Sequence, residues 1–408
     1  MLHLWIWKKL NDRVDREGLW EVLRIYGVGG QLLNGMKAFY ERASACVKVD
    51  GETGESFEIK VGVRQGCVMS PWLFNIYMDG VVRDMKAKIG QGKGAKLEWE
   101  GERWWMVASL FADDTVLLAE SEDELQSVVN EFCRVCERRK LKVNVNKSKV
   151  MVFERKRSEV VEFHRPYRVV DNEFEECKIE MNGERMEEVT EFKYLGSMLC
   201  KHNGMRSEVR ERTMQGRRMI GALNQIVGFR EMSEEVKKGL RDSILLPTLT
   251  YGAELWTWNQ QERSKIQAVE MSYLRSSLGV TRWDQVENEE IYRRFGMSER
   301  GEGMKCGVVE WVKRSTLRWF GHVQRMEENV LARKTHASSV EGRGVRGRPP
   351  ASWDNRVEEY LSERGLNGVM GMRRARERCK DRNSWRLFCR GHPLEGTLRR
   401  GRGVSDID

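Results

Sequence analysis

The stretch LFADDTVLL (Leu110–Leu118) decides how the rest of the chain is interpreted. Two adjacent carboxylates, Asp113 and Asp114, separate the apolar runs Met106–Ala112 and Thr115–Ala119. Short apolar runs broken by a polar pair predict a strand, a tight turn and a second strand. Because side chains alternate between the two faces of a strand, neighbouring aspartates converge only at such a turn.

The aspartate pair has two interpretations. Two like charges this close repel unless a cation lies between them, so the pair is either a solvated turn or a metal site. Asp is common in turns, and the dipeptide alone therefore favours the solvated turn. The apolar flanks favour the metal site, because they bury the hairpin and leave the carboxylates at the edge of a core, where proteins hold Mg²⁺ for phosphoryl chemistry.

The length and composition indicate a multidomain protein with real cores, since the chain has 408 residues of which 40% are hydrophobic. No apolar run approaches the ~18 residues of a membrane span, and the N-terminus lacks the pattern of a signal peptide. Nine scattered cysteines indicate free thiols in a reducing compartment. We therefore expect an intracellular protein of the nucleus or cytoplasm, without a membrane segment.

The net charge of +9 is concentrated in the last part of the chain. The range Gly301–Asp408 holds 23 Lys/Arg and 14 Asp/Glu, an excess equal to that of the whole chain, so the first 300 residues are balanced. A neutral body followed by a basic region indicates an acidic polymer as partner, most simply nucleic acid. A basic domain without such a partner is the alternative.

A second motif, VRQGCVMSPWLF (Val63–Phe74), precedes the hairpin. Ser70 is expected to be the N-cap of a helix with Pro71 in its first position, and the helix should run to about Met85. Arg64-Gln65-Gly66 then forms a loop at a helix N-terminus. Such a loop suits phosphate or sugar contacts, although an ordinary strand-to-helix turn explains it equally well.

Three segments follow the hairpin. Ser121-Glu122-Asp123-Glu124 is expected to be a capping box that opens a helix ending near Lys140. Cys133 and Cys136 lie one turn apart on its apolar side, which favours core packing over zinc. LKVNVNKSKVMVF (Leu141–Phe153) alternates as a strand or hairpin carrying Lys147, and FKYLGSML (Phe192–Leu199) indicates a strand kinked at Gly196.

From about Arg206 the chain is predicted to be helical. One helix, Gly307–Glu327, presents a basic face of four residues: Arg314, Arg318, His322 and Arg325. A further basic helix is expected over Arg373–Arg386. Between them 341–350 is a flexible linker, and the tail past Gly391 is expected to be disordered. Cys379, Cys389 and His392 lack a fourth ligand at zinc-binding spacing.

The order of these motifs resembles that of the reverse transcriptases of LINE-type, non-LTR retrotransposons. FADD resembles the polymerase motif that holds the catalytic metals, and VRQGCVMSPWLFNIYMD resembles the motif before it, which lines the nucleotide pocket. LKVNVNKSK and FKYLGSML resemble the two motifs that follow, including the primer grip. LLPTLTYGAELWTW and the stretch from LRWFGHVQRM to RGRPPASW resemble the helical thumb and downstream region of the same elements.

The resemblance implies an RNA-directed DNA polymerase that uses Mg²⁺ (or Mn²⁺), an RNA template, a DNA primer and deoxynucleoside triphosphates. Asp113 and Asp114 would be catalytic metal ligands. The implied roles of the other residues are nucleotide and template contact (Arg64, Gln65, Gly66), protonation or neutralisation of the leaving pyrophosphate (Lys147), primer grip (Tyr194, Leu195, Gly196) and nucleic-acid binding in the basic region (Arg314, Arg318, Arg325).

The chain departs from the family in one motif. The family's F-x-D-L-x-K-A-Y-D-R-V matches Lys9–Val14 in its second half, which places Ile6 where the first catalytic Asp belongs. Isoleucine cannot bind Mg²⁺. The fingers and any upstream endonuclease are also missing from this sequence, so we expect a truncated remnant with impaired or lost activity. The alternatives are a non-catalytic nucleic-acid-binding protein and a relic without a ligand.

The expected fold is α+β, with an antiparallel sheet covered by helices on one face, as in a reverse-transcriptase palm. The expected domains are a partial palm at 1–200, a helical thumb at 201–300 and a basic region at 301–408.

Overall fold

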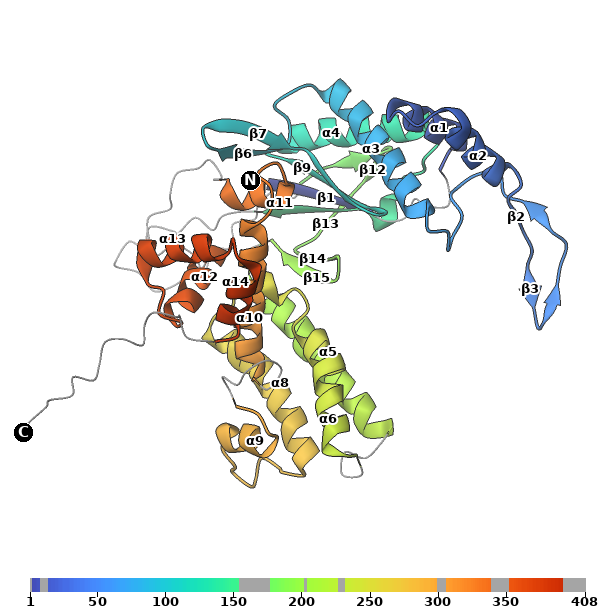
Figure 1. The fold of residues 1–408 in the computed structure, drawn as a ribbon. Helices are drawn as coiled ribbons and strands as arrows, with labels where there is room; N and C mark the ends of the chain where they lie inside the picture. The colour runs from blue at the N-terminus through green and yellow to red at the C-terminus, as the bar shows by residue number, and fades with distance from the viewer. Residues whose placement is uncertain are drawn as a thin grey trace, which may run out of the picture. The chain divides into compact units, whose positions relative to one another are not determined.

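A computed structural model describes residues 2–7, 14–153, 177–201, 204–226, 232–298, 306–338 and 352–391. The expected linker at 341–350 and the tail beyond Gly391 lie outside these ranges. The chain divides into two compact parts, unit 1 (Met1–Thr190 with Ser338–Arg343) and unit 2 (Glu191–Ala337 with Gly344–Asp408). Figure 1 shows the elements of both units.

Unit 1 is built on a five-stranded sheet with the strand order β13-β10-β1-β9-β8. Its strands are β1 (Leu2–Trp7), β8 (Ala108–Phe111), β9 (Asp114–Ala119), β10 (Lys149–Phe153) and β13 (Glu187–Glu188). Central β1 runs antiparallel to both β9 and β10, so these two strands begin at the same end of the sheet. Thr115 and the rest of β9 after it are buried, which explains the unbroken apolar run of this strand.

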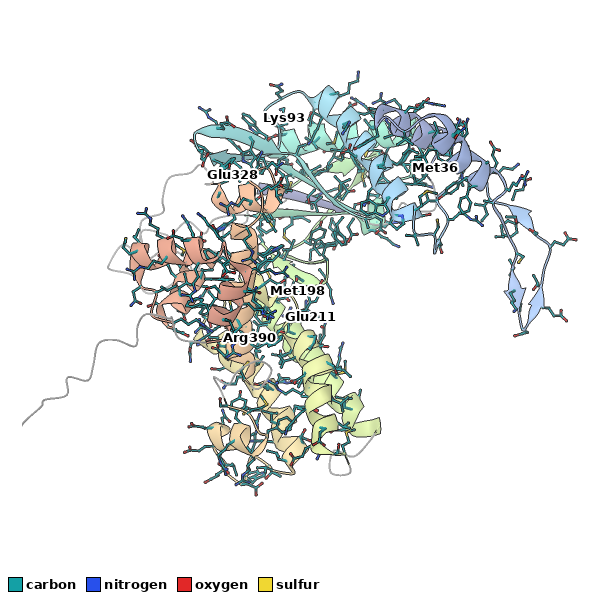
Figure 2. The ribbon with its side chains drawn as sticks, in the orientation of Figure 1. Met36, Lys93, Met198, Glu211, Glu328 and Arg390 are labelled. Carbon is teal, nitrogen blue, oxygen red and sulfur yellow. The ribbon has the colours of Figure 1, made fainter. Side chains whose placement is uncertain are left out.

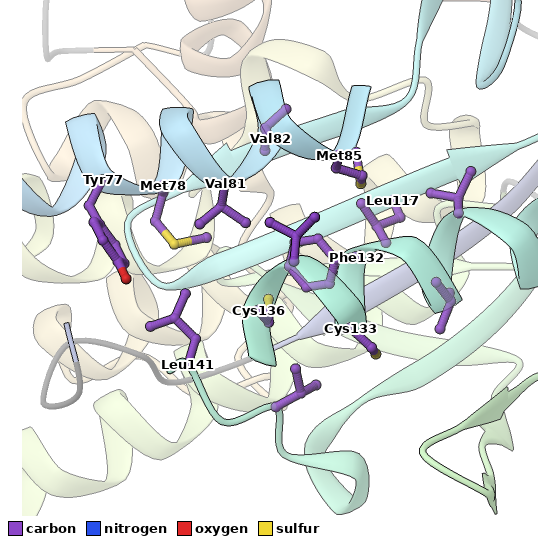
Figure 3. Close-up of a cluster of buried hydrophobic side chains, with 14 of the residues drawn as sticks. Tyr77, Met78, Val81, Val82, Met85, Leu117, Phe132, Cys133, Cys136 and Leu141 are labelled. Carbon is purple, nitrogen blue, oxygen red and sulfur yellow. The ribbon is translucent and has the colours of Figure 1, made fainter. Parts of the chain in front are cut away.

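The described part of unit 1 also contains the α-helices α1 (Arg16–Ile25), α2 (Gly30–Glu41), α3 (Ser70–Ile89) and α4 (Glu122–Arg138). α3 packs against α4, and α4 packs against β9. Val81, Leu117 and Phe132 meet in the core between these elements (Figure 3), and each is fully buried. Burial of each such side chain contributes about 1.5–3 kcal/mol, so the β9 hairpin is anchored from its buried strand.

Short strand pairs lie outside the main sheet. They are β2 (Ser44–Ala45) with β5 (Phe57–Glu58), β3 (Lys48–Val49) with β4 (Glu52–Thr53), β6 (Ala95–Trp99) with β7 (Glu102–Met106), and β11 (Glu180–Met181) with β12 (Glu184–Arg185). Apart from the parallel β10–β13 pair, all named strand pairs of unit 1 are antiparallel. Helices with small, mainly antiparallel sheets are what the sequence predicted.

The start of α3 differs from the prediction. Met69 is the N-cap, no side chain caps this end, and Ser70 is the first helical residue. The Ser70 hydroxyl is instead within 3.1 Å of the Tyr40 hydroxyl, so it bonds across the core rather than along its own helix. The helix also runs beyond Met85 to Ile89, where Gly90 ends it with a φ of 80°.

The predicted capping box at α4 forms only by half. Ser121 caps the helix and accepts a bond from the Glu124 N–H at 3.2 Å. The Glu124 carboxylate does not bond back to Ser121; it accepts the N–H groups of Gly94 at 2.6 Å and Glu120 at 3.1 Å. Glu124 therefore ties the turn before β6 to α4, a tertiary role that the local pattern could not indicate.

The predicted strand or hairpin at Leu141–Phe153 is strand only in its second half, β10. Before it, Val145–Lys147 form a 3₁₀ turn, labelled η2. The Asn144 side chain accepts a bond from the Lys147 N–H at 3.2 Å, which offers the backbone an alternative to strand pairing.

Unit 2 begins with a hairpin, β14 (Glu191–Tyr194) and β15 (Ser197–Cys200), and its other named elements are helical. Its longer helices are α5 (Arg206–Ile226), α8 (Gln260–Leu278) and α10 (Val308–Gln324). The shorter elements are α6 (Glu234–Leu240), the π segment η3 (Arg241–Leu245), α7 (Leu246–Leu249), η4 (Ala253–Leu255), α9 (Asn288–Arg294), α11 (Leu331–Ala337), α12 (Trp353–Ser362), α13 (Gly368–Arg378) and α14 (Arg382–Cys389).

Two cores hold unit 2 together. One joins α5, α7, α8, α9 and the start of α10, and the other joins the second half of α10 to α12, α13 and α14. Trp256 and Trp258 belong to the first core. The indole N–H of Trp258 donates to the Tyr360 hydroxyl at 2.9 Å, which links the first core to α12.

Two predictions for unit 2 are wrong in detail. The stretch Phe192–Leu199 is a two-stranded hairpin, because Leu195 (φ 48°) and Gly196 (φ 86°) both take positive φ and reverse the chain. The basic helix predicted over Arg373–Arg386 is two helices, α13 and α14. Asp381 separates them, since its side chain caps α14 by accepting the Asn383 N–H at 2.9 Å.

None of the helices in the described ranges combines the length and apolar content that crossing a bilayer requires.

Candidate active site

The aspartate pair lies at the tip of the β8–β9 hairpin. Phe111 pairs with Asp114, and Ala112 and Asp113 make the turn between them. Ala112 has a φ of 50°, the left-handed conformation that two-residue turns require. Asp113 is therefore a turn residue and Asp114 the first residue of β9, and both side chains are half-buried. This is the strand–turn–strand arrangement that the sequence predicted.

Position 6 lies on the strand beside this hairpin. In the register of β1 with β9, Trp7 pairs with Thr115 and Ile6 with Val116. Ile6 therefore lies opposite a residue two positions along β9 from Asp114. A carboxylate-bearing residue at position 6 of β1 would therefore be a neighbour of Asp113 and Asp114.

A pocket of about 760 Å³ lies against the hairpin. Its wall includes Leu110, Phe111 and Ala112 from the hairpin and Arg64, Gln65 and Gly66 from the loop before α3. These two segments are far apart in sequence, and each was predicted independently to take part in the site. Asp113 directly follows Ala112 in the turn, although neither Asp113 nor Asp114 is among the residues that line the pocket.

The pocket's third wall is a face of α3 that the sequence interpretation missed. Pro71, Phe74, Asn75, Met78 and Asp79 line it. They recur at helical spacing along α3, a signal that could have been combined with the loop before it. Within the same pocket the Arg64 guanidinium lies over the Phe39 ring, 4.6 Å from its centre, which fixes this side chain at the rim.

Lys147 approaches the site from the opposite edge of β1. β9 and β10 begin at the same end of the sheet, and Ile6 is paired with Val116 on one side and Lys149 on the other. Lys147, two residues before Lys149, is exposed at the end of the 3₁₀ turn. One strand, β1, separates β10, which Lys147 precedes, from β9, which begins at Asp114.

The described residues supply only part of a two-metal donor set. Asp113 and Asp114 can each offer carboxylate oxygens to Mg²⁺ or Mn²⁺. A group of three or more His, Cys, Asp or Glu side chains close enough to hold a metal ion does not occur in the described ranges. The donor set near the hairpin is thus two adjacent carboxylates.

The reverse transcriptase (RNA-dependent DNA polymerase) family matches residues 7–199 of this chain. That range contains the hairpin, the pocket loop and Lys147. Residues 7–199 are a reverse transcriptase domain of the LINE, or non-LTR, type. The match begins at Trp7, directly after Ile6.

Individual relatives of the reverse transcriptase domain are transposon proteins. A putative uncharacterized transposon-derived protein of Caenorhabditis elegans is 25% identical over 260 residues, which are 63% of this chain and 86% of that protein. The Retrovirus-related Pol polyprotein from a type-2 retrotransposable element of Drosophila melanogaster is 30% identical over 139 residues, 34% of this chain and 12% of the polyprotein. The RNA-directed DNA polymerase from the mobile element jockey of Drosophila melanogaster is 21% identical over 339 residues, 81% of this chain and 32% of that protein.

The reverse transcriptase match reaches Leu199 in the β14–β15 hairpin, which carries the predicted primer-grip residues Tyr194, Leu195 and Gly196. This hairpin belongs to unit 2, where α5 and Tyr251 hold its turn. The Tyr251 hydroxyl donates to the Leu195 carbonyl at 2.9 Å, and the Arg212 guanidinium donates to the Gly196 carbonyl. Sequence reasoning missed both partners, since neither carries a local signal that points to the turn.

Arg212 is itself held in place. It lies over the Tyr251 ring at 4.9 Å and donates to the Glu208 carboxylate at 2.6 Å. Glu208 in turn accepts the Met198 N–H at 2.6 Å. Figure 2 labels Met198 on the hairpin and Glu211 on α5. The turn at Leu195-Gly196 is therefore clamped at its tip by a network that is anchored on the buried Arg212–Glu208 pair.

The three arginines predicted to bind nucleic acid lie outside the reverse transcriptase match, on α10 and at its end. Arg318 is exposed, with its guanidinium 5.1 Å from the centre of the Trp311 ring. Arg314 is only 4% exposed, and its Nε donates to Glu310 at 2.8 Å. Arg325 is half-buried and donates to the Cys379 carbonyl at 2.8 Å. The four-residue basic face that the spacing predicted is therefore not a continuous solvent-exposed face, because helix packing buries part of it.

Cys133, Cys379 and Cys389, for which the sequence disfavoured zinc binding, are buried in hydrophobic cores. Burial raises the pKa of Cys133 to about 11, and that of Cys379 and Cys389 to about 12. Thiols of this kind are protonated at neutral pH, which disfavours metal binding. His392 lies outside the described residues.

Proposed function

We propose that the chain binds an RNA template, a DNA primer and a deoxynucleoside triphosphate as an RNA-directed DNA polymerase does, but extends the primer poorly. The single observation that carries this proposal is the pocket of about 760 Å³ between the FADD hairpin and the Arg64-Gln65-Gly66 loop. Residues of two motifs of the reverse transcriptase domain line this cavity, and Asp113 directly follows the lining residue Ala112, which supports the proposal.

In this proposal Asp113 and Asp114 hold Mg²⁺ or Mn²⁺, which would supply charge neutralisation for phosphoryl transfer. Gln65 and Gly66 contact the incoming nucleotide and the template, and Arg64 contributes a charged hydrogen-bond donor at the pocket rim. Lys147, exposed at the same end of the sheet, is available to neutralise or protonate the leaving pyrophosphate. Each role is proposed from position and chemistry together.

The proposed impairment rests on Ile6. By the match to the family's K-A-Y-D-R-V motif, this residue occupies the position of the first catalytic aspartate, and its strand adjoins β9. An aliphatic side chain supplies no oxygen to a cation. Loss of a shared metal ligand removes several kcal/mol of transition-state stabilisation, so we expect a rate roughly 100-fold or more below that of the restored site.

The remaining assignments concern larger parts. Unit 1 with the β14–β15 hairpin would be most of a polymerase palm, and the helices from α5 to α9 a thumb. Tyr194, Leu195 and Gly196 would position the primer end. The tight clamp on the Leu195-Gly196 turn supports a positioning role, because a fixed turn can hold a primer in one place.

A second candidate function is nucleic-acid binding without catalysis. The excess of basic residues after Gly301 favours it. In that case Arg318, the exposed member of the three predicted arginines, would contact phosphate, while the buried Arg314 would act structurally.

Primer extension on an RNA template, in Mg²⁺ and separately in Mn²⁺, tests the proposal. We expect weak extension that Asp113→Asn abolishes, together with salt-sensitive binding of a primer–template duplex that Asp113→Asn leaves unchanged. Extension that survives Asp113→Asn would place the chemistry elsewhere. Complete absence of duplex binding would rule out both candidate functions.

A further inference from the structure

The helices α13 and α14 carry an excess of cations outside the reverse transcriptase match. From Gly368 to Gly391 the sequence has eight basic and two acidic residues. Seven of the basic side chains are exposed and are here called the α13–α14 basic surface: Arg373, Arg374, Arg376, Lys380, Arg382, Arg386 and Arg390. Arg378, the eighth, is half-buried against the Phe388 ring at 5.7 Å.

The spacing of these residues separates the charged from the packed side of each helix. Arg382, Arg386 and Arg390 recur every four residues along α14 and its C-cap, so they share one stripe. Trp385, Phe388 and Cys389 are buried in the second core of unit 2. The stripe is therefore fixed in place by packing on the other side of α14; Figure 2 labels Arg390 at its end.

Ion pairing distinguishes this surface from the helices packed beside it. On α10, α12 and the turn after α12 most cations have carboxylate partners: Arg314 and Arg364 with Glu310, Arg356 with Glu359, and Lys313 with Glu363. Arg318 of α10 instead lies over the Trp311 ring. None of the seven residues of the α13–α14 basic surface forms an ion pair with another residue of the described ranges. One of the two acidic residues nearby, Asp381, is occupied in capping α14.

Helix stability does not explain the whole surface. Arg376 and Arg386 lie in the last turns of their helices, where a cation interacts favourably with the helix dipole. Arg382 lies in the first turn of α14, where the same dipole repels it. A stripe that begins at the unfavourable end of a helix and has no ion-pair partner within the described ranges is suited to an external anion.

We propose that the α13–α14 basic surface binds the phosphodiester backbone of a nucleic acid strand. This inference rests on the proposed function, which brings RNA and DNA to the chain. Guanidinium groups pair with phosphate oxygens through two parallel hydrogen bonds, and the seven cations of this surface can each displace a condensed counterion. The surface thus supplies a sequence-independent contact outside the polymerase pocket, and RNA and DNA are its two possible sources of phosphate.

Binding measured by fluorescence polarisation on the full chain tests the inference. The probes are a labelled 25-base-pair DNA duplex and an RNA duplex of the same sequence, each from about 0.05 to 0.3 M KCl. The α14 variant carries Arg382→Gln, Arg386→Gln and Arg390→Gln, and the α13 variant carries Arg373→Gln, Arg374→Gln and Arg376→Gln. The matched control, Lys265→Gln with Arg293→Gln and Arg294→Gln, removes the same charge from exposed positions elsewhere in unit 2.

We expect the α14 variant to bind at least one probe on the order of 100-fold more weakly at 0.15 M salt, with a log–log salt slope lower by roughly 0.9 for each phosphate that the variant no longer neutralises. The control should change affinity by less than about 3-fold, since it removes only general attraction. The probe whose affinity falls more identifies the strand. The α13 variant should show a weakening of the same kind.

Two outcomes overturn the inference and differ in meaning. If the wild type binds with steep salt dependence and both helix variants bind like the control, the surface is not the site, while the proposed function stands. If the wild type binds neither probe, both fail together. Near-UV circular dichroism of the variants, expected to match the wild type because the side chains are exposed, distinguishes weaker phosphate binding from misfolding.

Discussion

The two hairpins that carry the predicted motifs, β8–β9 in unit 1 and β14–β15 in unit 2, both turn on two residues but are held in opposite ways. In the first, β9 is an inner strand of a five-stranded sheet and Leu117 is fully buried, so the packing of the strand next to the turn fixes the turn. In the second, the sheet has only two strands, and Arg212 and Tyr251 bind the carbonyls of the turn itself.

This difference separates a reactive turn from a positioning turn. The first tip is anchored through the buried residues of β9, and Asp113 directly follows Ala112, which lines a pocket. A tip whose carbonyls are already bonded has little freedom to move, and the Leu195-Gly196 turn presents a fixed backbone. The comparison supports catalytic carboxylates on the first hairpin and a primer-positioning element on the second.

The largest effect is expected from Arg212→Ala. Arg212 and Glu208 are both nearly fully buried, so the substitution leaves a carboxylate without its cation and also releases the Gly196 carbonyl. We expect the free energy of unfolding of unit 2 to fall by about 3–5 kcal/mol, measured by urea denaturation, with loss of hydrogen-exchange protection at the Met198 amide.

Arg210→Ala is the matched control for Arg212→Ala. Arg210 lies on α5, as Arg212 does, and pairs with Glu191 of β14 at 2.8 Å. Because the Arg210 side chain is 70% exposed, the decrease in stability should stay below about 1 kcal/mol. Equal effects of the two substitutions would mean that the turn is not clamped at its tip.

Leu117→Ala tests the opposite mode of support in the first hairpin. Removing this buried side chain from β9 should destabilise unit 1 by about 2–5 kcal/mol and weaken protection along β9. Leu195→Ala, at a 37% exposed position in the other turn, should change stability by less than about 1 kcal/mol. If Leu195→Ala destabilised the protein more than Leu117→Ala does, the proposed difference in how the two hairpins are held would be wrong.

A pair of turn substitutions should act with opposite signs. Gly196→Ala places a Cβ at a φ of 86° and 3.0 Å from the Tyr251 ring, and we expect a destabilisation of about 1–2 kcal/mol. Ala112→Gly relieves a φ of 50°, and we expect a change between zero and about 0.5 kcal/mol of stabilisation. Thermal denaturation of both variants checks this, and destabilisation by Ala112→Gly would show that the first tip is also held.

The smallest effect concerns the accessibility of the pocket beside the first turn. The backbone N–H of Met69 donates to the Cys67 sulfur and lowers the pKa of this pocket-lining thiol, whereas burial raises the pKa of Cys133 to about 11. Thiolate is the reactive form, so iodoacetamide at pH 7.5 should label Cys67 well before Cys133, as peptide mass spectrometry would report. Simultaneous labelling would indicate that the pocket is closed or the core is open.

The sequence predicted the first hairpin well and the second poorly, and the physical reason is the same contrast. Apolar runs around Asp113-Asp114 reflect burial of β9, which is a local pattern. The turn at Leu195-Gly196 depends on Arg212 and Tyr251, which are distant in sequence, so Phe192–Leu199 was interpreted as a kinked strand. Positive φ at Leu195 has no residue-level signal, since leucine rarely adopts it.

The residues of the candidate site were likewise predicted where a local sequence pattern marks them and missed where only distant contacts do. Arg64, Gln65 and Gly66 were predicted from a loop before a helix, and the pocket places them opposite the FADD hairpin. The α3 face that completes the pocket was missed because its spacing also fits ordinary packing. Arg314 was expected at the surface, but its periodicity could not show that Glu310 and Arg364 lie beside it.

Restoration of the missing carboxylate tests the central claim most directly. In Ile6→Asp, an aspartate replaces isoleucine on β1 opposite Val116, beside the strand that begins with Asp114. Primer extension in Mg²⁺ should rise roughly 100-fold or more over wild type, and Asp113→Asn added to this variant should abolish the gain. Ile6→Asn, similar in size but without the negative charge, should not restore the rate. Wild-type extension as fast as that of Ile6→Asp would contradict the account, because the site would then work without the carboxylate.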